Sequence, residues 1–173
     1  MGFVRIAGLI ERGREHSKCL VAPLPIILLS PGARPPTESS LDVAECDLIR
    51  KIRKRGTILF ADGAKSWRKA AESSGLHFES VNHSLLQFAK SVKLPEGVRA
   101  VGPQKKSKQI TAGTQTLDRA WQDLKKYVPS ELHAKDHKAN TVNGDLWEYI
   151  YSWQWRRNCG MDLWQSVPDL FHA

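Results

Sequence analysis

The stretch TILFADG, from Thr57 to Gly63, decides the fold class of this chain. Its apolar part, residues 57–61, is short and continuous, which is typical of a fully buried strand. Residues 64–74 then have the composition of a helix, and residues 76–81 form a second β-prone run. Because strands that are joined through a helix pair in parallel, this order predicts a parallel unit with Asp62 at its carboxyl edge.

The residues before this unit predict a hairpin and a helix. Residues 3–11 and 18–24 are β-prone runs separated by a turn, which indicates an antiparallel hairpin. Residues 30–36 form a loop rich in Pro and Gly. Residues 41–55 have helical spacing, with basic residues crowding the predicted C-terminal end.

The residues after the unit complete a mixed α/β pattern, with helices packed on a sheet. We predict a short helix over residues 85–92, a long polar surface loop over 91–113, and a helix over 116–127. The segment 145–158 alternates aromatic residues as a strand does, but it also fits one helical face, and its length favours a helix. Packing in the core and stacking on bases are both open for these aromatic residues.

Size and charge limit the function classes. With 173 residues the chain suits one domain, and its net charge of +8 favours polyanionic partners, nucleic acid first and acidic membrane second. The alternative is a basic surface without a partner. The three cysteines are widely spaced and fit neither a disulfide framework nor a zinc site. We find no membrane-spanning run and no secretory signal, so we expect an intracellular protein without a membrane partner.

Asp62 and Asp118 are the residues from which we expect chemistry. Asp62 would point into the crevice where open α/β sheets bind ligands, although Asp before a helix is also a good N-cap. Asp118 flanks the apolar stripe of its helix, although an Asp in the first turn is also favoured by the helix dipole. The polar loop adds Lys105, Lys106 and Lys108 as predicted DNA contacts.

Taken in order, several motifs resemble the ISXO-like insertion-sequence transposases, a DDE-type family with an RNase H-like fold. The resemblance extends from Phe3 to Asn158. It rests on Ala61-Asp62-Gly63, Lys65-Ser66-Trp67, Val81-Asn82-His83-Ser84, the tract from Gly113 through Asp118 to Trp121, Leu124-Lys125, His133, and Trp155-Arg156-Arg157-Asn158.

The resemblance implies a DDE domain over residues 1–158, followed by a tail over 159–173. It implies that Asp62 and Asp118 are the second and third catalytic, metal-binding acids, and that Mg²⁺ or Mn²⁺ is the cofactor. The reaction would be hydrolysis of a DNA phosphodiester and then strand transfer, with two ions holding the attacking and leaving oxygens. Supporting roles would fall to Asn82, His83, Lys125, His133, Arg156 and Asn158.

Two departures from the family pattern bear on activity. The strand that carries the first acid comes before residue 3 in the family, and nothing in residues 1–10 supplies that acid, so we expect the first strand to be missing. The third acid is Asp118 where the family usually has Glu, and the shorter side chain reaches less far. We therefore expect catalysis to be impaired in this chain. If the chain nevertheless cuts DNA, Glu11, Glu15 and Asp42 are the first alternatives for the missing acid.

The leading interpretation is thus a transposase-derived protein of a DNA transposition system, with DNA as partner, a homo-oligomer as a further option, and a nuclear or nucleoid location. The second is a non-catalytic DNA-binding or interaction protein on the same scaffold. The third is a translated gene fragment without function. Metal-dependent nicking separates the first from the others, and cooperative folding separates the second from the third.

Overall fold

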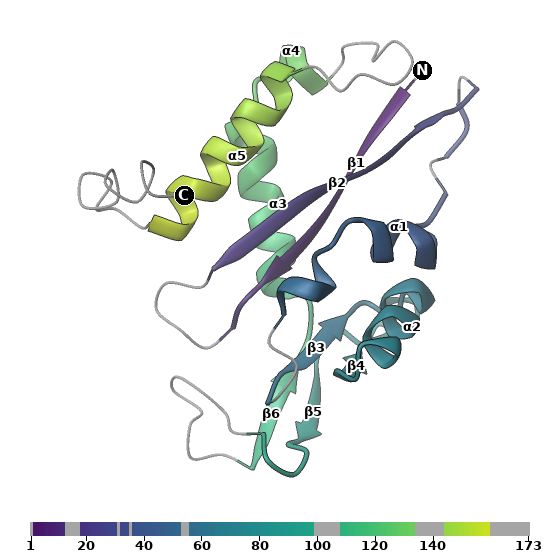
Figure 1. Ribbon diagram of the computed structural model, residues 1–173, viewed down its shortest axis with the longest axis vertical. Helices are drawn as coiled ribbons and strands as arrows, with labels where there is room; N and C mark the ends of the chain where they lie inside the picture. Colours follow the sequence, from purple (N-terminus) through teal and green to yellow (C-terminus); the bar gives the residue numbers. More distant parts are fainter. Residues whose placement is uncertain are drawn as a thin grey trace.

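Figure 1 shows the computed structural model, which describes residues 2–12, 18–30, 32–34, 36–52, 56–98, 108–133 and 144–159. The protein is a mixed α/β structure, as predicted. Its strands are β1 (Gly2–Ile10), β2 (Cys19–Leu28), β3 (Ile58–Ala61), β4 (His77–Ser80), β5 (Lys90–Lys93) and β6 (Gln109–Ala112). Its helices are α1 (Ser40–Glu45), α2 (Lys65–Ser73), α3 (Gln115–Tyr127), α4 (Ser130–His133) and α5 (Gly144–Cys159), with single 3-10 turns η1 (Ile49–Lys51) and η2 (His83–Leu85).

The strands pair in three separate two-stranded sheets within the described residues, and not in the single sheet that we expected. β1 and β2 form the predicted antiparallel hairpin, with Ala7 opposite Ala22. β3 and β4 form the predicted parallel pair, with Ala61 opposite Ser80. β5 and β6 form an antiparallel ribbon.

Three predicted elements are wrong in whole or in part. The helix expected over residues 41–55 ends after α1, because Asp47 has a φ of 61°, a left-handed conformation that cannot continue a right-handed helix. The helix expected over 85–92 and part of the loop expected over 91–113 are instead η2, β5 and β6. The β-branched residues Val92, Ile110 and Thr111 favour strands, and their partners come from outside any local window.

Helices α3 and α5 cover one side of the hairpin and make the largest core cluster (Figure 1). The buried residues Ala120, Ile150 and Trp153 pack there together with Cys19 and Val21 of β2. Gly8 of β1 lies under the ring of Trp121, which leaves no room for a Cβ atom. Ala120 of α3 is a small, fully buried residue, and it therefore allows close packing of this helix.

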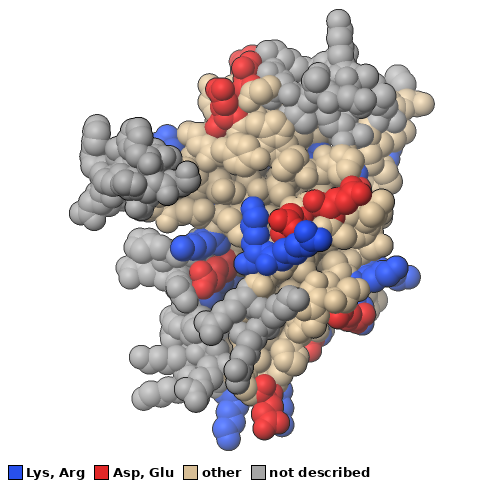
Figure 2. Space-filling model, viewed as in Figure 1, with Lys and Arg blue, Asp and Glu red and all other residues tan. Residues whose placement is uncertain are grey.

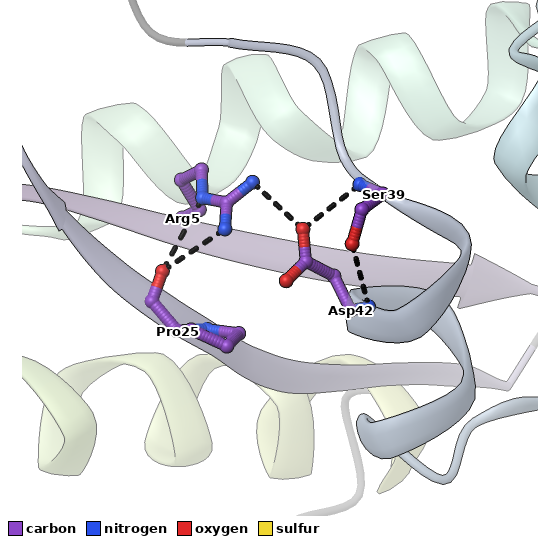
Figure 3. Close-up of polar contacts among 4 residues, drawn as sticks. All are labelled: Arg5, Pro25, Ser39 and Asp42. Carbon is purple, nitrogen blue, oxygen red and sulfur yellow. Dashed lines mark hydrogen bonds and ion pairs between the residues drawn. The ribbon is translucent and has the colours of Figure 1, made fainter.

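Helix α1 is fixed to the hairpin by an ion pair in the close-up of Figure 3. The guanidinium Nη1 of Arg5 lies 3.1 Å from Oδ2 of Asp42, and both side chains are mostly buried, at 11% and 15% exposure. Asp42 also accepts the backbone N–H of Ser39 at 2.9 Å, which completes a capping box. This backbone hydrogen bond is the main reason why the pKa of Asp42 is lowered, with Arg5 adding to it.

Candidate functional site

The carboxyl end of the β3–β4 pair brings Asp62 next to the turn that follows β4. Because the N–H of Val81 donates to the carbonyl of Ala61 at 3.1 Å, the two backbone segments stay paired as far as the last residue of β3. Gly63 then turns the chain with a φ of 90°, against the carbonyl of Val81. Asp62 is exposed, and its Oδ1 accepts the N–H of Ala64 at 3.4 Å. The N-cap of α2 is Ala64 itself, so Asp62 supports the helix start from two positions before the cap.

Asp118 is tied to the same turn through Thr114. The hydroxyl of Thr114 donates to Oδ2 of Asp118 at 3.2 Å. Oγ1 of Thr114 also lies 3.3 Å from Nε2 of His83. With the hydroxyl proton directed to the carboxylate, the contact to His83 is a hydrogen bond in the tautomer that carries its proton on Nε2. The order His83–Thr114–Asp118 therefore links the exit of β4 to the first turn of α3.

The segments that carry Asp62, Asn82 and His83, and Asp118 are thus connected in turn, because the end of β3 pairs with Val81 and Thr114 contacts both His83 and Asp118. Thr114 joins them, and sequence reasoning gave it no role, although a Thr just before a helix is a common capping residue. In the structure its side chain makes no cap hydrogen bond and is used between His83 and Asp118 instead. Only the knowledge that two distant segments meet could have identified it.

A two-metal centre needs more acidic ligands than these segments supply. Among the residues that the structure describes, no group of three or more His, Cys, Asp or Glu side chains could hold a metal ion. Asp62 and Asp118 provide hard carboxylate oxygens of the kind that suit Mg²⁺ or Mn²⁺. One oxygen of Asp118 is already hydrogen-bonded to Thr114, however. The described donor set does not fit a pair of ions.

Two of the predicted supporting residues, Arg156 and Asn158, make their contacts elsewhere. Arg156 donates to the Tyr127 hydroxyl at 3.4 Å and stacks over its ring at 5.6 Å. Hydrogen bonds from Ser152 and then Arg156 lower the pKa of Tyr127.

Asn158 pairs with the backbone of Cys19. Lys125 is exposed near the C-terminal end of α3, away from the first turn that holds Asp118. His133 ends α4, and its side chain lies outside the described residues.

The β5–β6 ribbon carries a polar face without acidic side chains. Ser91 lies opposite Thr111 and Lys93 opposite Gln109, so these four exposed side chains share one face. Lys108 is exposed at the start of β6, and its carbonyl accepts the N–H of Leu94 at 2.9 Å. The other predicted DNA contacts, Lys105 and Lys106, lie outside the described residues, in the segment that joins the two strands.

Charge on the face shown in Figure 2 is mixed. Lys and Arg side chains gather near the middle of the molecule beside Asp and Glu side chains. The basic surplus is therefore not one continuous field over the described part of this face. Along the sequence, residues 86–113 hold six Lys or Arg and a single Glu.

No family model, curated protein or solved structure matches this chain. Across the described residues, no helix combines the length and the apolar character that crossing a bilayer requires.

Proposed function

We propose that this chain is a DNA-binding protein derived from a DDE-type transposase, and that its own metal site is incomplete. The observation that carries the proposal is the pair of hydrogen bonds that links His83, after β4, to Asp118 in the first turn of α3, with Asp62 following the strand that pairs with β4. These residues are separated in sequence, and the His83–Thr114–Asp118 hydrogen bonds connect two of the three motifs. In the family that the sequence resembles, these segments hold the reacting DNA phosphate.

The mixed α/β arrangement of strands and helices is compatible with the RNase H-like fold that the resemblance implies. Among the described residues β1 pairs only with β2, and β3 only with β4. The guanidinium of Arg12, two residues after β1, lies 5.7 Å from the centre of the Phe60 ring of β3. Leu9 of β1 packs against two core clusters, one with Leu59 of β3 and the other with Ala22 and Leu24 of β2. The hairpin and the β3–β4 pair therefore contribute to the same core.

The polar face of the β5–β6 ribbon supports DNA as the partner. A two-stranded β-ribbon fits the major groove of B-DNA, and Lys, Gln, Ser and Thr side chains are donors and acceptors for base edges and phosphates. The ribbon face formed by Ser91, Lys93, Gln109 and Thr111 has this chemistry. The Lys-rich segment that connects the strands adds phosphate contacts. A protein with this task would act in the nucleus or the nucleoid.

The acids support binding without efficient cutting. Two carboxylates leave at least one ion of a metal pair short of ligands, and displacement at phosphorus depends on both ions. Asp42, one alternative for the first acid, is committed to Arg5 and Ser39 (Figure 3). We therefore expect Asp62 and Asp118 to bind a divalent ion weakly and not to support strand cleavage.

A plasmid assay tests this function. Supercoiled DNA is incubated with the protein and Mg²⁺, then with Mn²⁺, and the products are compared with those of the Asp62→Ala variant. We expect retarded but uncut plasmid with both proteins. Cleavage that Asp62→Ala abolishes would show that the metal site is complete after all. Plasmid that is neither retarded nor cut would contradict DNA binding itself.

A further inference from the structure

The turn after β4 exposes three large apolar side chains within four positions. Leu85 is 75% exposed, Leu86 79% and Phe88 49%. The exposed large apolar residues of the described chain are otherwise Leu41, Tyr149 and Tyr151, which lie on helices. A concentration of apolar surface at one tip is a signature of contact with another molecule.

The backbone of this tip is strained as well. Leu86 has a φ of 55°, a left-handed conformation that is rare for a residue with a branched side chain. Hydrogen bonds hold it there, from the N–H of Leu86 to the carbonyl of His83 and from Gln87 to Asn82. Strain of this kind persists only where the surroundings fix it, and it gathers at ligand-binding sites.

The base of the tip is rigidly seated on the candidate site. The ring of His83 contacts that of Phe88, with 5.1 Å between centroids. The carbonyl of Phe88 approaches Gly113 so closely that a Cβ there would lie 2.7 Å from it. Thr114, the next residue, holds both His83 and Asp118. The exposed leucines are thus presented on a fixed base that Thr114 connects to Asp118.

We propose that Leu85 and Leu86 form a wedge that inserts between base pairs of duplex DNA bound at this site, an inference that rests on the proposed function. Leu and Phe side chains are used in this way by proteins that kink DNA. Charge favours DNA as the partner, because the residues that follow the tip, 89–113, hold six Lys or Arg and one Glu. A second copy of the chain docked at the same tip would bring two such basic segments together, and they would repel.

The test uses duplex DNA that contains 2-aminopurine, whose fluorescence rises when a base step is unstacked. The double variant Leu85→Ala and Leu86→Asn removes the wedge. Asn is chosen at position 86 because it tolerates the left-handed conformation. The matched control is Leu41→Ala, since Leu41 is also exposed, at 64%, but lies on α1. Circular dichroism melts of all three proteins establish that each is folded.

We expect the wild type and Leu41→Ala to raise the fluorescence equally. The wedge variant should give no rise and should bind about 10-fold more weakly, because the apolar contacts are lost while the phosphate contacts stay. The affinity of the wedge variant should therefore depend on salt as that of the wild type does.

Three outcomes would overturn the wedge. Unaltered fluorescence on binding of the wild type would show that DNA is bound without insertion, which leaves the proposed function standing. Failure of the wild type to bind DNA at all would contradict both the wedge and the proposed DNA-binding function. A dimer in sedimentation that becomes a monomer in the double variant would show that the tip is a contact between two copies of this chain.

Discussion

Asn158 of α5 pairs with the backbone of Cys19 of β2 through both atoms of its amide. Its Oδ1 accepts the Cys19 N–H at 2.6 Å, and its Nδ2 donates to the Cys19 carbonyl at 2.9 Å. One helical turn earlier, Oε1 of Gln154 accepts the N–H of Val21, also at 2.6 Å. Helix α5 therefore closes the outer edge of the hairpin with side-chain amides, as a neighbouring strand would with its backbone.

Removal of this amide should destabilise the fold. We expect Asn158→Ala to lower the free energy of unfolding by about 1–3 kcal/mol, because the N–H and C=O of a buried residue lose their partners. Asn158→Asp should cost at least as much, since its carboxylate keeps the acceptor but faces the Cys19 carbonyl. Urea titration measures both variants. DNA affinity below the melting temperature should not change, and a specific loss of binding would instead give Asn158 the supporting role in the site that the sequence predicted.

The Arg5–Asp42–Ser39 contacts make a second stability prediction (Figure 3). Asp42→Ala leaves the mostly buried Arg5 without its counter-charge and should cost about 3 kcal/mol. Ser39→Ala removes only the N-cap of α1 and should cost about 1 kcal/mol. Since the pKa of Asp42 is lowered in the folded protein, its contribution is present above the unfolded pKa and is lost as the pH falls through the folded one. Equal costs for the two variants would mean that the ion pair contributes nothing.

Cys19 predicts a loss of stability at high pH. Burial raises the pKa of its thiol from 9.0 to about 11, although the charge of Arg157 opposes the shift. The folded state then keeps a proton that the unfolded state releases, so the free energy of unfolding should fall by about 1.4 kcal/mol per pH unit between these values. Melts of the wild type and Cys19→Ala from pH 8 to 11 measure the difference in slope. Parallel curves would show that the thiol titrates normally in the fold.

Local patterns predicted the elements that have a strong period or a clear stop. The hairpin, the β3–α2–β4 unit, α3 and α5 follow from apolar spacing and turn residues. Helix 41–55 was wrong because Asp47 adopts a left-handed conformation that only its surroundings select. Strands β5 and β6 were missed because each is four residues long and gains its stability from the other.

The positions of Asp62 after a strand and of Asp118 in the first turn of a helix were predictable from the sequence, and the hydrogen bonds around them were not. Asp62 followed from the end of a buried strand, and Asp118 from the first turn of a helix. Thr114 lies 31 residues from His83, and Asn158 lies 139 residues from Cys19, so no local window contains both partners. Such pairings depend on how the elements pack, which a single sequence does not specify.

The salt dependence of DNA binding tests whether the protein binds DNA through its phosphates. Fluorescence anisotropy of a labelled duplex gives the affinity as salt is raised. We predict largely sequence-independent binding, with the logarithm of the association constant falling linearly with that of the salt concentration, because phosphate contacts release counterions.

The loop lysines should account for part of that slope. Changing Lys105, Lys106 and Lys108 to Ala should flatten it by up to about 3 units if each neutralises one phosphate. A control variant that removes three exposed charges elsewhere, Arg50, Lys51 and Lys126, should leave the slope unchanged. An affinity that does not change as salt is raised, or no binding by the wild type, would contradict DNA binding through phosphate contacts.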